Sequence, residues 1–462
     1  MMMITLVIIG AVIAIFGTAY AARQTATVDG FYTGAQSDGA APDLWTLVLS
    51  QVTTWIFARS LLNSTILGYY YGVAGSLAYT AYYLSFLTGG YAVMKLRARR
   101  HGSVQDWLHH SFGPLGGITY NVVIALRLLS EVFANLLVIG LIFSVLMPQA
   151  DGIKTLSILA VASLTLVYSG WGGLRASLKT DVLQMILFAV VFSVAFAYMI
   201  VAPDFEWSAI LTSGGTSGAH NGWILLVVAL LQVPSYPLHD PVMMDRGFLS
   251  DDDTARKSFY HAFWIASVFI FAFGLFGIYA AEVGSKIESD LLGTWSMLFP
   301  APITAALMVS LLISGVSTLD SALSSAARLM VEELKLFPRS LMGGRWAMVM
   351  FLGAGAVLTL WGNATLFDAV AVSGTASMFL TPILIVGLVA GRRVALWSYL
   401  VGFAAAAIGA VMYFARGSDW AAALLPDAHK YTQLLVICVV VLVIGFAATL
   451  LGSSRVAPDA KG

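Results

Sequence analysis

Long apolar runs dominate this chain, and most polar residues lie in the short stretches between them. About 20 mostly apolar residues cross the hydrocarbon core of a bilayer as a helix. The runs predict about thirteen such helices, at 3–22, 44–69, 73–95, 118–148, 153–171, 178–201, 222–240, 257–281, 302–332, 345–362, 366–390, 394–415 and 431–452. An odd number of spans places the two termini on opposite sides of the membrane.

The composition agrees with this pattern. Hydrophobic residues make up 59% of the 462 residues, charged residues make up 10%, and the mean hydropathy is +0.86. These values are typical of membrane proteins. No hydrophilic stretch is long enough for a soluble domain, so we expect an all-α polytopic protein with one integral domain over 1–462. The run 3–22 lacks the basic start of a signal peptide, although Tyr-Ala-Ala at its end would suit cleavage, and we expect it to be a retained span.

The basic residues predict the orientation. With the N-terminus outside, inward-facing loops collect 18 Lys and Arg residues and outward-facing loops collect 4. Cytoplasmic loops carry such an excess, so the C-terminus is expected in the cytoplasm and the protein in a cell membrane, the bacterial inner membrane in particular. The two remaining basic residues, Arg59 and Arg127, lie within predicted spans.

The span 302–332 carries hydroxyls and a carboxylate where a simple anchor would be apolar. The polar residues are Ser314, Ser317, Thr318, Asp320, Ser321, Ser324 and Ser325. Such oxygens suit a small hard cation, and the span offers no Cys or His for a soft metal. Close helix packing is the alternative explanation for the serines. It does not explain Asp320, because an ionisable residue inside a membrane needs a partner, a cavity or an ion.

Two further spans are polar or interrupted. The span 44–69 is polar from Ser50 to Ser60, and the span 222–240 contains Gln232, Pro234, Tyr236 and Pro237. Proline frees backbone carbonyls, which at membrane depth must lie against protein or a wet cavity. Interrupted helices at matching places in two halves indicate the midplane site of a secondary transporter. The halves would be 44–201 and an inverted 222–390, followed by two peripheral helices within 394–452.

Several function classes are disfavoured. The formal net charge is zero, which gives no indication of nucleic-acid binding. A single cysteine, Cys438, allows no intrachain disulfide or thiol metal site. The chain has no GxxxxGK[ST] loop, so ATP is not expected as the energy source. We expect a transporter of a small polar solute, embedded in lipid, with no enzymatic activity and no organic cofactor.

Four segments, in order, resemble the sodium:solute symporter family. They are DGFYTG (29–34), YSGWGGLRASLKTDVLQM (168–185), MDRGFLSDDDTARKSF (244–259) and GVSTLDSALSSAARL (315–329). The resemblance covers about residues 1–450. It implies the inverted-repeat fold of the leucine-transporter group, in the APC superfamily. That fold has two inverted five-helix repeats, here with one extra N-terminal and two extra C-terminal helices, and the family implies sodium as the coupling ion.

The resemblance also implies a first sodium site between the first and eighth core helices. Its ligands would be the backbone carbonyls of Thr53 and Ile56, within about one residue, together with the Ser314 carbonyl and the Ser317 and Thr318 hydroxyls. Some members have a second cation site, which maps to Asp181, Ser317, Asp320 and Ser321. The chain departs from that pattern because Asp320 replaces a hydroxyl, so the pair of carboxylates would bind a cation more tightly or hold a proton. Alternatively, Asp181 lies in the first turn of its own helix, where a carboxylate caps the helix and interacts favourably with the helix dipole.

The solute class stays open between a neutral urea-like solute, a small carboxylate and an amino acid. Residues 50–75 are locally similar to the urea-transporting branch, whereas Arg127 suits a carboxylate unless Glu131, one turn later, neutralises it. The candidate solute-binding residues are Ser60, Arg127, Glu131, Gln232, Tyr236 and Ser373. Two alternatives to a sodium symporter remain, an ion-independent channel for a small neutral solute and a transporter-like membrane sensor.

Overall fold

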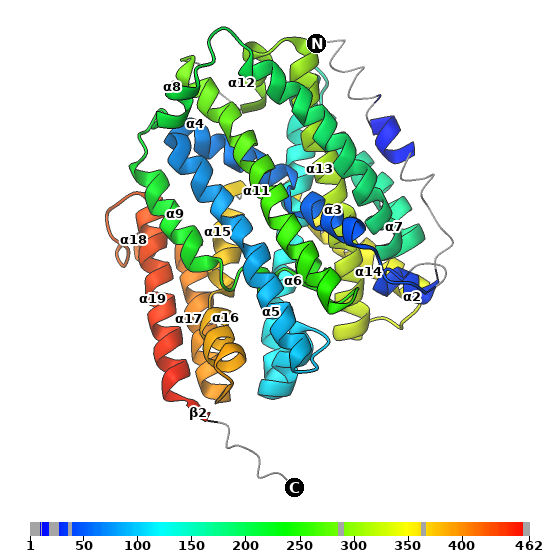
Figure 1. Ribbon diagram of the computed structural model, residues 1–462, viewed down its shortest axis with the longest axis vertical. Coiled ribbons are helices and arrows are strands. Elements are labelled where there is room, and N and C mark those ends of the chain that lie inside the picture. The colour runs from blue at the N-terminus through cyan, green and yellow to red at the C-terminus, as the bar shows by residue number, and fades with distance from the viewer. Residues whose placement is uncertain are drawn as a thin grey trace.

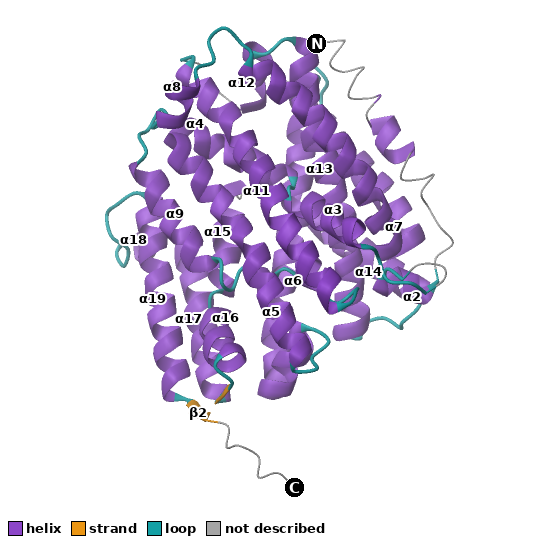
Figure 2. Ribbon diagram, viewed as in Figure 1, coloured by secondary structure: helices purple, strands orange, loops and turns teal. Residues whose placement is uncertain are grey.

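Helices form almost all of the regular structure in the computed structural model (Figures 1 and 2). The structure describes residues 10, 12–17, 27–35, 39–284, 291–361 and 366–455. The strands in that part of the chain are β1 (Arg392–Val394) and β2 (Ser453–Arg455), which pair antiparallel with Arg393 opposite Ser454. The predicted all-α class is confirmed. Within the predicted span 3–22, residues 10 and 12–17 are helical, and the rest of it lies outside the described residues.

The first half of the bundle begins with a short helix and continues through a broken one. Its elements are α2 (Val28–Thr33), α3 (Leu44–Trp55), α4 (Ala58–Ala81), the 3₁₀ turn η1 (Tyr82–Leu84), α5 (Ser85–Ala98), α6 (Val104–Leu146) and α7 (Ile153–Ile200). Asp43 caps α3, because its Oδ1 accepts from the backbone N–H groups of Trp45 and Thr46 at 2.9 and 3.1 Å.

Glycines divide three of these helices into separate straight segments. At 1.5 Å per residue, the 48 residues of α7 would extend about 72 Å, more than twice the hydrocarbon thickness of about 30 Å. Gly173 bends α7 with φ 58° and ψ −147°, between the predicted spans 153–171 and 178–201. Gly72 bends α4 in the same way between the predicted spans 44–69 and 73–95, and Gly113 separates a short first segment of α6 from its span. These boundaries are confirmed.

The second half repeats the opening of the first with another broken helix. Its elements are α8 (Trp207–Thr212), α9 (His220–Gln232), the 3₁₀ turn η2 (Pro237–His239), α10 (Pro241–Arg246), α11 (Asp252–Glu282), α12 (Leu291–Leu298), α13 (Ala301–Arg328), the π-turn η3 (Leu329–Glu333), α14 (Leu341–Trp361), α15 (Leu366–Ser377), α16 (Leu380–Pro382) and the π-turn η4 (Ile383–Val389). The peripheral helices are α17 (Leu396–Phe414), α18 (Asp419–Ala422) and α19 (Lys430–Leu451). Figure 1 shows α8 and α12 at one end of the bundle and β2 at the other.

The two predicted helix breaks are present. The helical path stops between α3 and α4 at Ile56 and Phe57, and between α9 and α10 at 233–240. Side chains satisfy the carbonyls that each break frees: the Tyr83 hydroxyl donates to the Trp55 carbonyl at 2.6 Å, and the Thr88 hydroxyl donates to the Val233 carbonyl at 3.0 Å. This is the condition under which irregular backbone survives at membrane depth.

Helix α13 lies inside the bundle. In its most apolar 18-residue stretch 89% of the residues are buried, compared with 33% in α7 and 39% in α14. In the described part of the chain, seven helices are long and apolar enough to cross a membrane, namely α6, α7, α11, α13 with η3, α14, α17 and α19. Because protein surrounds α13, its hydroxyls and Asp320 face other helices and not lipid.

Alanine substitutions at two of the glycine bends, Gly72 and Gly113, should differ in the stability that they cost. Gly72 and Gly113 both have positive φ, 59° and 66°, but a Cβ at Gly72 would overlap the Ser213 carbonyl, whereas a Cβ at Gly113 meets nothing within 4 Å. Gly113→Ala should therefore cost about 1–3 kcal/mol, the penalty for placing a side chain at φ 66° and ψ −160°, a region nearly restricted to glycine. Gly72→Ala should lower the thermal unfolding midpoint in detergent clearly more than Gly113→Ala does. Equal losses in the two variants would show that the contact with Ser213 does not constrain the bend.

Candidate functional site

The two helix breaks face each other across a small cavity. The cavity is about 10 Å³ and is lined by Trp55, Phe57, Ser60, Tyr79, Tyr82, Tyr83, Arg127 and Tyr236. The rings of Trp55 and Tyr236, one from each break, pack edge to face with centroids 5.7 Å apart. A space of this size holds about one water. The breaks therefore meet around an enclosed centre with aromatic walls.

The predicted solute-binding residues fall into two groups. Ser60, Arg127 and Tyr236 line the cavity. Glu131 and Gln232 lie one contact away, since Glu131 pairs with Arg127 and the Gln232 Oε1 accepts from the cavity-lining Tyr82 at 2.8 Å. Ser373 is not among the lining residues and hydrogen-bonds the His239 Nε2 at 2.9 Å. The role of all six in solute binding stays a prediction.

Three tyrosines form part of the cavity wall. Tyr79, Tyr82 and Tyr83 are buried and line the cavity. Tyr79 also donates to the Ser60 hydroxyl at 3.2 Å. Sequence offers no signal that separates them from the neighbouring Tyr69 to Tyr71, because both groups are aromatic clusters in apolar surroundings.

Arg127 is neutralised by two carboxylates. Its Nη2 lies 2.5 Å from the Glu131 Oε1 and 3.0 Å from the Asp240 Oδ2, and all three side chains are buried. The pairing with Glu131 was one of the two alternatives open from sequence, and Asp240 had been interpreted as a loop residue. Because both acids engage Arg127, this guanidinium is not a free partner for an anionic solute.

Three of the five oxygens expected for the first sodium site, the Ile56 and Ser314 carbonyls and the Thr318 hydroxyl, belong to one hydrogen-bonded group at the first break. The Ser314 hydroxyl donates to the Ile56 carbonyl, and the Thr318 hydroxyl donates to the Ser314 carbonyl at 2.9 Å. Thr318 Oγ1 also lies 3.4 Å from the Thr54 carbonyl. The Thr53 side chain instead faces the Met185 sulfur at 3.5 Å, so the contact with Thr318 favours Thr54, one residue later. Hydroxyl and carbonyl oxygens of this kind fit a sodium ion.

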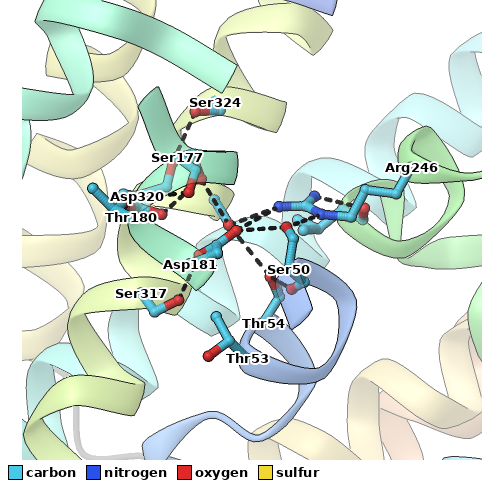
Figure 3. A network of polar contacts seen from close by, with 12 residues as sticks. Ser50, Thr53, Thr54, Ser177, Thr180, Asp181, Arg246, Ser317, Asp320 and Ser324 are labelled. Carbon is cyan, nitrogen blue, oxygen red and sulfur yellow. Dashed lines mark hydrogen bonds and ion pairs between the residues drawn. The ribbon is translucent and has the colours of Figure 1, made fainter. Parts of the chain in front are cut away.

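Ser317 joins this cluster to a second one. Its hydroxyl donates to the Asp181 Oδ1 at 2.7 Å, and the Asp181 Oδ2 accepts from the Ser50 hydroxyl at 2.5 Å (Figure 3). Asp181 thus links α7 to α13 and to α3, and its role in a cation site stays a prediction. The neighbouring hydroxyls of Ser317 and Thr318 therefore have different partners.

Asp320 is satisfied by hydroxyl groups of α7. Its carboxylate accepts from Tyr168 at 2.6 Å, from Ser177 at 2.8 Å and from Thr180 at 3.1 Å (Figure 3). Hydrogen bonds to a charged carboxylate stabilise that form inside a protein. Both Asp320 carboxylate oxygens therefore have a hydroxyl group within hydrogen-bond distance.

Arg246 occupies the space between the acids and hydroxyls of the predicted second cation site. Its Nη2 lies 2.9 Å from the Ser321 hydroxyl and 3.4 Å from the Asp181 Oδ2, and its Nε donates to the Ser50 hydroxyl at 2.7 Å (Figure 3). Arg246 is fully buried, although the sequence had placed it in a cytoplasmic loop. Four of the residues that sequence reasoning missed here, Ser50, Thr54, Ser177 and Tyr168, are polar residues of spans or of a matched segment, but Arg246 carries no periodic signal.

Comparison with known proteins gives a match in structure alone. No protein-family model matches the chain, and no curated protein matches its sequence. A Na⁺-coupled sialic acid symporter, substrate-bound and outward-open, is similar over 98% of this chain and 99% of its own, with a TM-score of 0.73 and 14% identity. Mhp1, a nucleobase-cation-symport-1 family transporter with bromovinylhydantoin bound, is similar over 92% and 96%, with a TM-score of 0.60 and 13% identity.

MhsT in complex with L-phenylalanine is also similar, over 88% of this chain and 97% of its own, with a TM-score of 0.52 and 13% identity. All three are similar over most of both chains, which shows a common fold. The chain therefore has the inverted-repeat fold of the leucine-transporter group, as predicted from the resemblance.

The contact of Arg246 with Asp181 predicts strong energetic coupling. Removing one partner of a buried ion pair costs about 3–5 kcal/mol, because the other charge stays buried. Arg246→Gln and Asp181→Asn should each destabilise by about that amount, and the double variant should cost clearly less than their sum. The measurement is a double-mutant cycle on unfolding in detergent. The exposed pair Arg256–Asp253, 2.9 Å apart, is the control, with an expected coupling below about 1 kcal/mol. Additive losses at Arg246 and Asp181 would contradict the pairing.

Proposed function

We propose that this protein is a sodium-coupled symporter of the sodium:solute symporter family, importing a small polar organic solute by alternating access. The observation that carries the proposal is the oxygen cluster at the first break, where Ser314 and Thr318 of α13 meet the backbone of Thr54 and Ile56. Four sequence segments in family order and the fold support it. One protein of this fold is described as a Na⁺-coupled symporter.

Sodium at this cluster would link two elements that must move relative to each other. Its positive charge would replace the hydrogen bonds by which Ser314 and Thr318 now satisfy the freed carbonyls. Because Ile56 is adjacent to Phe57 in the cavity wall, a change at the ion site reaches the solute site through one peptide unit. The binding of sodium and the binding of solute are thereby coupled through the break. In this proposal α13 stays in place while the broken helix changes.

One sodium ion per cycle is the proposed stoichiometry. The guanidinium of Arg246 already supplies a positive charge at the predicted second site, against Asp181 and Ser321. A sodium ion there would have to displace a buried cation. One ion crossing about 100 mV contributes about 2.3 kcal/mol, and a tenfold concentration ratio adds about 1.4 kcal/mol. Together they support accumulation of a neutral solute by several hundredfold.

The cavity favours a carrier over a channel. A channel for a neutral solute needs a continuous wet path, whereas the space between the breaks is about 10 Å³ and has aromatic walls on both sides. The proposed orientation has the N-terminus outside and the C-terminus in the cytoplasm of a bacterial inner membrane. The decisive assay is a solute screen in proteoliposomes with and without an inward sodium gradient. Equal uptake in both conditions would contradict symport and support a channel.

Sodium should stabilise the purified protein through Ser317 and Thr318. A ligand that binds only the folded state raises the unfolding midpoint in proportion to the logarithm of its concentration. In the variant Ser317→Ala/Thr318→Ala the sodium concentration for half of this effect should rise by about tenfold or more. Ser310→Ala is the matched control, because Ser310 lies on the same helix and donates to the Ala306 carbonyl of that helix. The account fails if the double variant keeps the wild-type sodium dependence, or if potassium stabilises as well as sodium.

The sodium dependence of initial uptake should have a Hill coefficient near one. Arg246 at the second site and the three hydroxyl donors to Asp320 both reduce the need for another ion. The coefficient is measured at neutral and mildly acidic pH in proteoliposomes loaded with the solute found in the screen. A coefficient clearly above one at both pH values would mean that sodium displaces the guanidinium.

A further inference from the structure

A buried arginine beside the cavity has no hydrogen-bond partner among the residues that the structure describes. Arg59 lies in the first turn of α4, directly after the first break, and its side chain is 0% exposed. None of its guanidinium nitrogens Nε, Nη1 and Nη2 has a hydrogen-bond partner within the residues that the structure describes. Buried charges are normally paired and hydrogen-bonded, and an intramembrane ionisable residue indicates a functional site.

The neighbouring acids pair with other arginines, although the Glu131 Oε2 has no hydrogen-bond partner within the described residues. Glu131 and Asp240 are both within ion-pair distance of Arg127, and Asp181 is within ion-pair distance of Arg246. The recorded neighbour of Arg59 is the Phe57 ring, whose centroid lies 4.9 Å from the guanidinium carbon. A cation–π contact does not satisfy the in-plane N–H donors of the guanidinium. Arg59, Arg127 and Arg246 are the three fully buried arginines near the helix breaks. Among the described residues, Arg59 is the one of the three with no carboxylate within ion-pair distance.

Arg59 belongs to the wall of the solute cavity by position. Phe57 and Ser60, on either side of it in sequence, line the cavity. The Phe57 ring also lies 5.9 Å from the Arg127 guanidinium, so one aromatic side chain contacts both cations. Arg59 itself is not among the residues that line this enclosed cavity. The Phe57 ring, which lines the cavity and contacts the Arg59 guanidinium, therefore connects Arg59 to the solute cavity.

The formal charges of the site balance, whereas its hydrogen bonds do not. Arg59 and Arg127 carry two positive charges, and Glu131 and Asp240 carry two negative charges, so the group is neutral as a whole. Arg127 nevertheless takes both carboxylates, which leaves the Arg59 donors unused. A neutral solute would leave this cation unpaired throughout the cycle, whereas a carboxylate would accept two parallel hydrogen bonds from it. The adjacent start of α4 also favours an anion.

We propose that the solute is a small monocarboxylate and that Arg59 is the residue that binds its carboxylate. This inference rests on the proposed symport function and narrows its solute class. Bound carboxylate brings a negative charge next to the break at Ile56 and Phe57, and sodium at the Ile56 and Thr318 oxygens brings a positive one. The two ligands enter as a neutral pair. The attraction between their opposite charges makes each of them bind more tightly in the presence of the other.

The inference predicts transport without net charge movement. One sodium ion and one monocarboxylate together carry no charge, so uptake should follow the sodium gradient and be insensitive to membrane potential. A neutral solute with one sodium ion would instead be driven by an inside-negative potential. Proteoliposomes with a potassium diffusion potential set by valinomycin separate the two cases.

The binding experiment compares matched acids and amides. Purified protein in saturating sodium is titrated with acetate, propionate and lactate, and with acetamide, propionamide and lactamide, following the unfolding midpoint. At least one carboxylate should bind more tightly than its amide. Arg59→Gln should weaken that carboxylate by about 10- to 100-fold, the loss of one charge-assisted contact, without changing the sodium dependence. Arg59→Lys should retain part of the affinity. Arg345→Gln is the control, because its Nε donates to the Gly170 carbonyl at 2.7 Å in another part of the bundle.

Each outcome decides the proposal. Amides that bind as well as their acids, carboxylate binding unchanged in Arg59→Gln, or sodium stabilisation without any carboxylate effect would overturn the inference and leave sodium symport intact. A protein that sodium does not stabilise would instead contradict the proposed function itself. If Arg59→Gln does not fold, the comparison of acids with amides and the potential dependence of uptake in the unmodified protein still decide. Potential-driven uptake would count against the monocarboxylate.

Discussion

The interruption of the first core helix at Ile56 and Phe57 is the constraint on which the rest of this structure depends. A break at membrane depth exposes carbonyls that water cannot reach, and the protein must supply their partners. Here the partners come from distant parts of the chain, namely Tyr83 for the Trp55 carbonyl and Ser314 for the Ile56 carbonyl. The hydroxyl-rich face of α13 follows from this need, and the same oxygens fit a small cation. Structure and proposed coupling therefore share one set of atoms.

Buried charge around the break is organised by pairing. Arg127 takes two carboxylates, and Arg246 takes one carboxylate and two serine hydroxyls. Each of these two guanidiniums lies within ion-pair distance of at least one carboxylate, which offsets part of the cost of burying its charge. The pair Arg246–Asp181 also connects α10 to α7, so that the second break is tied to the first half of the bundle. Arg59 departs from this arrangement, which is why its unused donors point to a ligand and not to a structural role.

The sequence allowed the fold to be predicted well because its determinants are local and repeated. Apolar runs, the polar centre of 44–69 and the prolines near 234–237 each leave a direct signal, and the glycine bends fall between predicted spans. The side-chain pairings could be predicted only in part. Asp181 and Ser317 were placed through family resemblance, and Arg127 with Glu131 through their helical spacing. Arg246 was misplaced because it stands among loop charges, and the tyrosines of the cavity were not identified because burial within a bundle depends on packing between distant helices. Arg59 was visible as a basic residue inside a span, but only the structure shows that its guanidinium has no hydrogen-bond partner in the described part of the chain.

The number of sodium ions bound per protein chain tests the central claim most directly. Purified protein at saturating radioactive sodium, counted by equilibrium binding, should hold one ion per chain, because we propose one site at the Ile56 and Thr318 oxygens and propose that the Arg246 guanidinium takes the place of a second ion. Saturation at zero would contradict the sodium site at the break. Saturation at two would contradict the assignment of Arg246 as the resident cation of the second site.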